Sequence, residues 1–93
     1  MRLKENELSA IKKTISGFDP KAKIFLFGSR TDDEKKGGDI DVLILSEKIN
    51  LGDKIKILKT LNNSIGEQKI DIVIAKDDSK PFIKLALEKG VEL

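Results

Sequence analysis

The sequence predicts a small α/β (α+β) fold in which a mixed β-sheet is covered by helices. Its 93 residues give room for one hydrophobic core, so we expect a single domain over residues 1–93. Segments with apolar residues at helical spacing alternate with short runs that are almost entirely apolar, which is typical of buried strands. Apolar residues make up 39% of the chain and charged residues 37%, as expected for a packed core with an ionised surface.

Two elements are predicted before residue 28. The spacing predicts an amphipathic helix from about Leu3 to Gly17, ended by Gly17 and the Asp19-Pro20 turn, because apolar residues recur every three or four positions at Leu8, Ile11, Ile15 and Phe18. The run from Lys23 to Phe27 predicts a strand that is buried on both faces. This strand leads directly into Gly28-Ser29.

A second strand is predicted from Asp39 to Leu45, after a polar connection that ends in Gly37-Gly38. Successive side chains of a strand point to opposite faces. One face therefore carries Asp39, Asp41, Leu43 and Leu45, and the other carries Ile40, Val42 and Ile44. Both carboxylates are expected to point the same way.

The remainder of the chain predicts a helix, a strand and a final helix. The first of these helices is marked by Leu51, Ile55, Leu58, Leu61 and Ile65, and Gly66 is expected to end it. In the strand from Ile70 to Ala75, Asp71 and Val73 lie on the face opposite to Ile70, Ile72 and Ile74. Ser79 is expected to cap the last helix, with Pro81 in its first turn and Gly90 just past its end.

Composition excludes several kinds of chemistry. The chain has no Cys and no His, so thiolate and imidazole metal sites and histidine bases are absent, and a metal ion must be held by oxygen, which favours Mg²⁺ or Mn²⁺. No apolar run is long enough to span a bilayer and the start lacks the apolar core of a signal peptide, so we expect a cytoplasmic protein without a membrane partner. The net charge of +2 supports nucleic-acid binding only weakly.

The residues that carry chemistry stand at strand ends. Gly28-Ser29 follows the first strand, and a glycine there lets a phosphate group approach the main chain. Asp39 and Asp41, two residues apart on one strand, can ligate one or two divalent ions, and Asp71 on a neighbouring strand can complete the site. Three carboxylates so close together repel one another unless a metal ion neutralises them.

Each of these features also has an ordinary structural interpretation. A lone Gly-Ser after a strand is most often a turn in which Ser29 caps a helix. A lone Asp-x-Asp is usually a solvated strand edge, and Asp71 by itself can be a surface acid. Both strands are otherwise apolar on both faces, however, so acids within them are hard to explain as solvated alternation.

Taken together, the segment LFGSRTDDEKKGGDIDVLIL and the later KIDIVIA resemble the DNA polymerase beta nucleotidyltransferase superfamily, and its minimal nucleotidyltransferases in particular. The resemblance spans about Ile24 to Ala75. It implies a palm-like core in which Gly28, Ser29 and Arg30 bind the nucleotide. It also implies that Asp39, Asp41 and Asp71 are catalytic and hold Mg²⁺, or Mn²⁺, with Asp71 serving the attacking hydroxyl.

The resemblance further implies a reaction and a partner. Minimal members of the superfamily are typically paired with a small helical HEPN-type protein in toxin–antitoxin modules, so we expect transfer of AMP from ATP, or of another nucleoside monophosphate, to such a protein. A rival hypothesis is a binding module that neutralises the partner by complex formation after its catalysis has decayed. Retention of all three acids favours the enzyme, whereas Asp32-Asp33 beside the phosphate turn favours decay.

Overall fold

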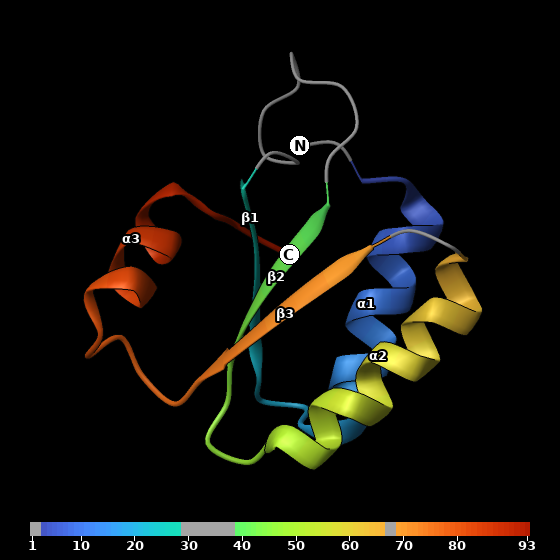
Figure 1. The fold of residues 1–93 in the computed structure, drawn as a ribbon, viewed down its shortest axis with the longest axis horizontal. Coiled ribbons are helices and arrows are strands. Elements are labelled where there is room, and N and C mark those ends of the chain that lie inside the picture. The colour runs from blue at the N-terminus through green and yellow to red at the C-terminus, as the bar shows by residue number, and fades with distance from the viewer. Residues whose placement is uncertain (1–2, 29–38, 67–68) are drawn as a thin grey trace.

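The computed structural model describes residues 3–28, 39–66 and 69–93. Along these segments the chain forms three helices and four strands (Figure 1). They are α1 (Glu5–Phe18), β1 (Lys23–Phe27), β2 (Ile40–Leu45), α2 (Leu51–Ile65), β3 (Ile70–Ala75), α3 (Pro81–Lys89) and β4 (Val91–Glu92). The six elements expected from the sequence are confirmed in order, and β4 is an addition.

The strands form one mixed sheet in the order β3-β2-β1-β4. β1 runs antiparallel to both β2 and β4, whereas β2 and β3 are parallel. Parallel neighbours need a long crossover connection, and α2 supplies it between β2 and β3. The predicted α+β architecture with a mixed sheet is therefore confirmed.

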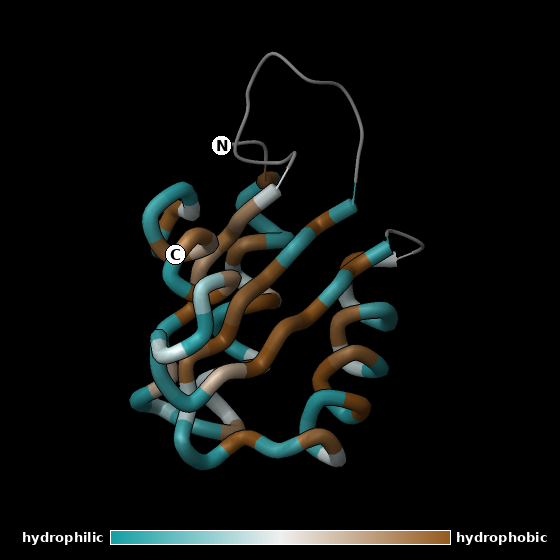
Figure 2. Tube along the Cα trace, turned by 60° about the vertical axis from the view of Figure 1, so that its left-hand side comes forward, coloured by the Kyte–Doolittle hydropathy of each residue, from teal (hydrophilic) through white to brown (hydrophobic). Residues whose placement is uncertain are grey.

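Helices cover the two faces of the sheet unequally. Figure 1 shows α1 and α2 together on one face and α3 on the other. The first face holds the larger core, in which Ile40, Val42 and Ile44 of β2 are fully buried with residues of α1 and α2. Leu43 points the other way and packs against α3. A strand that is buried on both faces is apolar at most positions, which explains the run from Val42 to Leu45 in β2 and the largely brown strands in Figure 2.

The first helix begins and ends slightly later than its sequence pattern predicts. It starts at Glu5 rather than Leu3, and the Lys4 N–H donates to the Glu7 carboxylate at 2.9 Å, which satisfies a donor at the helix start. It ends at Phe18, so Gly17 lies inside the last turn, and its φ is not positive. The helix stops because Asp19 precedes a proline and adopts an extended backbone.

The other helix ends differ in how well the sequence predicts them. α2 ends at Ile65 and is followed by the cap residue Gly66, whose φ of 94° suits glycine, as expected. The prediction that Ser79 caps α3 is wrong, because Lys80 holds the cap position without a side-chain hydrogen bond. The Ser79 N–H instead donates to Asp77 Oδ1 at 3.0 Å in the preceding turn. Pro81 does occupy the first helical turn.

The strand β4 closes the other edge of the sheet after Gly90. Val91 pairs with Leu26 and Glu92 with Phe25. A Cβ at Gly90 would approach the Leu26 carbonyl oxygen to 3.0 Å and the Ala86 carbonyl oxygen to 2.5 Å, so glycine lets α3 turn back onto β1 at close range. In the described part of the chain, no helix is both long enough and apolar enough to cross a membrane.

Candidate active site

The predicted site residues Asp41 and Asp71 lie directly opposite each other on parallel neighbouring strands. Asp41 of β2 is the register partner of Asp71 of β3, and directly opposed side chains project from the same face of a sheet. That face is the one on which α3 packs, since Leu43 and Val73, two residues further along each strand, belong to the α3 core. Asp41 is half-buried and Asp71 is exposed. The fold thus brings two carboxylates together from residues thirty positions apart in sequence.

The surroundings of Asp41 disfavour the ionised form of its carboxyl. Burial raises its pKa above the ordinary value, and the negative charges of Asp71 and Asp39 raise it further. Lys69 opposes this rise in pKa without cancelling it. The ionised form of Asp41 is therefore disfavoured, first by burial and then by the neighbouring carboxylates, and a cation placed beside it would favour that form.

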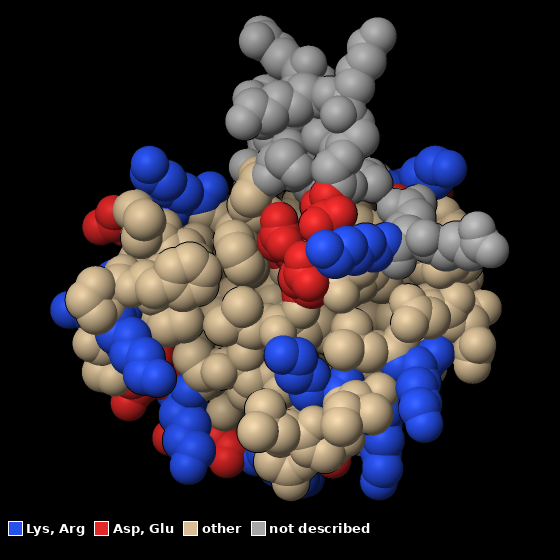
Figure 3. Space-filling view, in the orientation of Figure 1, with Lys and Arg blue, Asp and Glu red and all other residues tan. Residues whose placement is uncertain are grey.

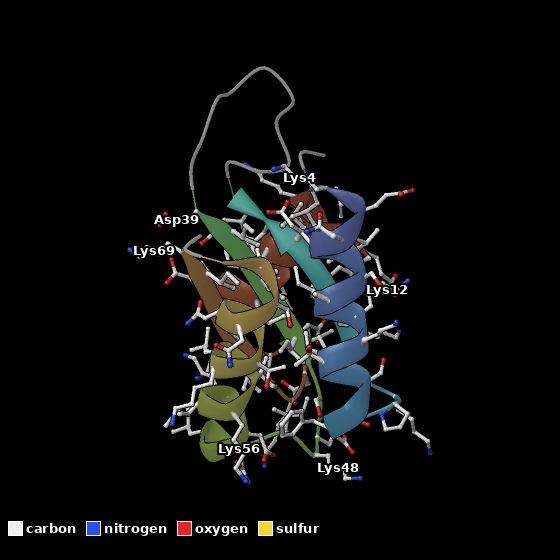
Figure 4. All side chains as sticks on the ribbon, turned by 90° about the vertical axis from the view of Figure 1, so that its right-hand side faces the viewer. Lys4, Lys12, Asp39, Lys48, Lys56 and Lys69 are labelled. Carbon is white, nitrogen blue, oxygen red and sulfur yellow. The ribbon has the colours of Figure 1, made fainter. Side chains whose placement is uncertain are left out.

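Asp39 immediately precedes β2 and contacts a lysine. The Lys69 Nζ lies 3.5 Å from Asp39 Oδ2, with side chains 71% and 42% exposed, and Figure 4 shows the two at the same end of the sheet. An ion pair this exposed contributes little free energy, so Asp39 can exchange Lys69 for another cation at small cost. Register explains the contact, because Ile40 pairs with Ile70 and sets the residues before them side by side.

Gly28 closes the site on the side of β1. Its φ is +78°, and a Cβ built on it would collide with the Asp41 carboxylate. Phe27, the residue before it, is the register partner of Asp41. Glycine is thus required at this position for two reasons, its backbone conformation and the space that Asp41 occupies. The predicted nucleotide-binding residues Ser29 and Arg30 lie outside the described residues.

The donor set suits a hard cation. Figure 3 shows acidic side chains gathered at the end of the sheet beside the segment drawn in grey. Within the described ranges, no three acidic residues are grouped closely enough to ligate one ion by themselves. Mg²⁺, however, normally binds through one or two carboxylates and takes its remaining ligands from water and substrate phosphates. The Asp41–Asp71 pair fits that mode, and the metal role of all three acids stays a prediction.

Sequence reasoning missed Lys69 and Phe82. Lys69 stands two residues before Asp71, as Asp39 stands before Asp41, so an assumed parallel register would have revealed their contact. Phe82 lies at the start of α3, is 54% exposed, and meets Phe27 edge to face with ring centroids 6.0 Å apart. Its outward position gives no periodic signal, because the buried side of α3 is carried by Ile83 and Ala86.

Comparison with known proteins agrees with this geometry. A scan against protein-family models matches residues 9–93 to the family described as polymerase beta nucleotidyltransferase. The match covers all four strands of the described sheet and includes Asp39, Asp41 and Asp71. A search of curated proteins found no match.

Proposed function

The chain belongs to the polymerase beta nucleotidyltransferase family, and we propose that it uses Mg²⁺ to transfer AMP from ATP to a partner protein. Nucleotidyl transfer in general follows from the family. The observation that carries the finer proposal is the placement of Asp41 opposite Asp71, with the Asp41 carboxylate in the space that a side chain at position 28 would need. This arrangement gathers unneutralised negative charge beside a turn of the kind that can admit a phosphate group.

Each residue has a role in the proposed reaction. Asp39, Asp41 and Asp71 would hold Mg²⁺, or Mn²⁺, together with the phosphates of ATP, and the metal would neutralise phosphate charge and acidify the attacking hydroxyl. Gly28, together with Ser29 and Arg30, binds the outer phosphates of ATP. Asp71, the most exposed of the paired acids, faces the acceptor and takes its proton. The acceptor oxygen then forms a bond to the α-phosphorus, the bond to the pyrophosphate oxygen breaks, and pyrophosphate leaves.

The acceptor in this proposal is a hydroxyl on another polypeptide. The chain has no Tyr, so a phenolic acceptor cannot be supplied in cis. The family resemblance favours a small helical HEPN-type protein, with this chain as the antitoxin that modifies it. A net charge of +2 gives only weak support to a nucleic-acid acceptor.

One observation favours the rival binding function. Asp39 is paired with Lys69, which places a protein cation where the proposal puts a metal ion. If that pair were permanent, the chain would neutralise its partner by complex formation alone. The exposure of both side chains makes the pair easy to break, and for this reason we favour the enzyme.

The two functions are separated by ligand-dependent stability and by label transfer. A ligand that binds only the folded state raises the melting temperature, so ATP with Mg²⁺ should protect the wild type more than either alone. The wild type should also transfer α-phosphate label from ATP to a copurifying protein. The double variant Asp39→Asn with Asp41→Asn should do neither, whereas Asp78→Asn, which removes an exposed acid after β3, should do both.

The fold of each variant provides the control. Because the double variant removes repelling charges, we expect it to melt no lower than the wild type without metal. Unfolding of that variant would make the acids structural and the proposed site wrong. Label on this chain alone, undiminished by the double substitution, would reject both the trans acceptor and the site.

A further inference from the structure

Among the described residues, β3 is the last strand at one edge of the sheet. One side of its backbone bonds to β2, and the other side faces away from the sheet. The carbonyls of Lys69 and Ala75 accept hydrogen bonds from the N–H groups of Ile40 and Ser46. The N–H and C=O groups of one strand residue point to the same neighbouring strand, and this direction alternates from residue to residue. The backbone groups of the odd-numbered residues of β3 therefore point toward β2. The N–H and C=O groups of Ile70, Ile72 and Ile74 therefore face away from the sheet. Figure 1 shows β3 at that edge.

The outer edge of β3 lies beside the proposed catalytic acid. A strand added to β3 would run about 4.8 Å from it. The residue directly opposite Asp71 would project from the same face of the sheet as Asp71 itself. The Cβ atoms of the two residues would lie about 5 Å apart, which brings a side-chain hydroxyl on that residue within reach of the Asp71 carboxylate.

A hollow continues along the same face and the same strand. It has a volume of about 540 Å³, and its lining includes Val73, Ala75, Phe82 and Ile83. Residues of an added strand opposite Val73 and Ala75 would share the face of the hydroxyl residue, two and four positions away from it. Apolar side chains at those two positions would enter the hollow. The edge of β3 would thus provide main-chain hydrogen bonds, which give affinity. The hollow would select the side chains of the added strand, which gives specificity, as is usual when a peptide adds to a sheet edge.

Lysines stand at both ends of the edge. Lys69 precedes β3 and Lys76 follows it, and both are exposed. Such lysines discourage self-pairing of an edge strand. In antiparallel pairing of two copies centred on Ile72, Lys69 of one copy would fall next to Lys76 of the other. An incoming segment with acidic residues at its ends is complementary to this pattern, and at Lys69 its carboxylate would replace the exposed pair with Asp39.

We propose that the acceptor polypeptide docks on β3 as an added antiparallel strand that places its hydroxyl opposite Asp71. The segment has apolar residues at the positions opposite Val73 and Ala75 and acidic residues at its ends. The antiparallel direction is chosen because it forms the more stable ladder. The inference rests on the proposed function for the role of the hydroxyl, whereas the docking itself does not need catalysis.

A synthetic peptide tests the docking. The probe Glu-Leu-Gln-Leu-Gln-Tyr-Gln-Glu sets its tyrosine opposite Asp71, its leucines opposite Val73 and Ala75, and its glutamates opposite Lys69 and Lys76. Exchange of backbone amides with deuterium, followed by NMR of the ¹⁵N-labelled chain, measures protection residue by residue. We expect millimolar peptide to slow exchange at Ile70, Ile72 and Ile74 by tenfold or more.

Backbone methylation of the probe gives a matched pair. Methyl groups on the amides of the first two glutamines, which would face β3, should abolish the protection. Methyl groups on the amides of the second leucine and the tyrosine, which would face solvent, should leave it intact. Equal behaviour of the two methylated peptides, or no protection by the parent peptide, overturns the proposal.

A matched pair of variants tests the same edge from the side of the protein. Ile74→Pro removes an outward N–H without breaking the ladder to β2, a place where an edge strand tolerates proline. Ile74→Ala removes a similar amount of side chain and keeps the N–H. Peptide protection should be lost in the first and kept in the second, and loss in both overturns the proposal. Dimerisation of the free chain through β3, measured by sedimentation, would overturn it in favour of a second copy.

Label transfer separates this inference from the proposed function. With α-labelled ATP and Mg²⁺, docked peptide should acquire label on its tyrosine. If no acceptor of any kind is labelled, the proposed function fails, and the exchange data still decide the docking. If the tyrosine is labelled equally with either methylated peptide, catalysis stands and strand docking is overturned.

Discussion

Replacement of Gly28 by alanine tests whether the Asp41 carboxylate is held where a metal ion needs it. The added Cβ would collide with that carboxylate, and its carboxyl carbon would lie 3.2 Å away. The obstructing atoms belong to the end of a side chain that can rotate. The carboxylate is therefore expected to move aside while the strand stays in place.

Two separate costs follow from this geometry. A φ of +78° is unfavourable for an L-amino acid with a side chain, by about 1–2 kcal/mol. For a domain of this size that corresponds to a melting temperature lower by about 4–16 °C. Displacement of the carboxylate adds little to unfolding but removes a ligand, so we expect the affinity for Mn²⁺ to fall by about tenfold or more, equivalent to about 1.4 kcal/mol.

Gly66→Ala is the matched control. Gly66 also has a positive φ, of 94°, but a Cβ there meets nothing within 4 Å. This variant should lose stability by about 1–3 kcal/mol and bind Mn²⁺ like the wild type in calorimetric titration below both melting temperatures. The reasoning is refuted if Gly28→Ala binds Mn²⁺ as tightly as the wild type, or if Gly66→Ala weakens binding equally.

Three further substitutions have defined outcomes. Because the pKa of Asp41 is raised above its ordinary 3.8, the folded state holds the proton more tightly, and metal-free stability should fall as pH rises from about 3.8 through the raised pKa. Asp41→Asn should therefore be more stable than the wild type at pH 7, but not below pH 3.8, when both are unfolded by urea in the presence of a chelator. Lower stability of the variant at pH 7 would count against the predicted repulsion. Asn50→Ala should cost about 1 kcal/mol of unfolding free energy, since the Asn50 side chain accepts from the Asp53 N–H at 2.9 Å at the start of α2; an unchanged denaturation midpoint would contradict that cap. Gly17→Ala, inside α1 with nothing within 4 Å of its Cβ, should raise the melting temperature through up to about 1 kcal/mol of helix propensity, and a lower value would show that Gly17 is needed.

Periodicity predicted the elements of this fold because most of them bury one continuous apolar surface. Helical spacing found α1 and α2, although Leu51 and Ile55 of the stripe that predicted α2 are exposed. Unbroken apolar runs found β1 and β2, because burial dictates residue type at most positions of these strands. β4 escaped prediction because two residues, both exposed, carry no period. The cap of α3 was mispredicted because a serine near a helix start is favoured only statistically, and here the Asp77 turn engages it first.

The candidate site was only partly predictable for a different reason. Alternation along a strand placed Asp39 and Asp41 on one side, because that depends on local geometry alone. The direct opposition of Asp41 and Asp71 depends on the register of two strands separated by α2, which apolar patterning does not fix to a single residue. Contacts set by register, such as Lys69 with Asp39, therefore appear only in the folded chain.

The placement of the acids links stability to activity. Asp41 interrupts a strand that is otherwise buried, and both its burial and its acidic neighbours disfavour its charge. A sequence selected only for stability would place an apolar residue or an asparagine there. If the proposed function holds, a cation that binds with the phosphates of a nucleotide would relieve this unfavourable charge, and its binding to the folded state alone would raise the stability of the fold. In the proposed reaction, the same binding event would prepare the Asp71 carboxylate, which belongs to the outermost strand β3, to meet the acceptor, and nucleotide binding would precede productive docking of the proposed partner.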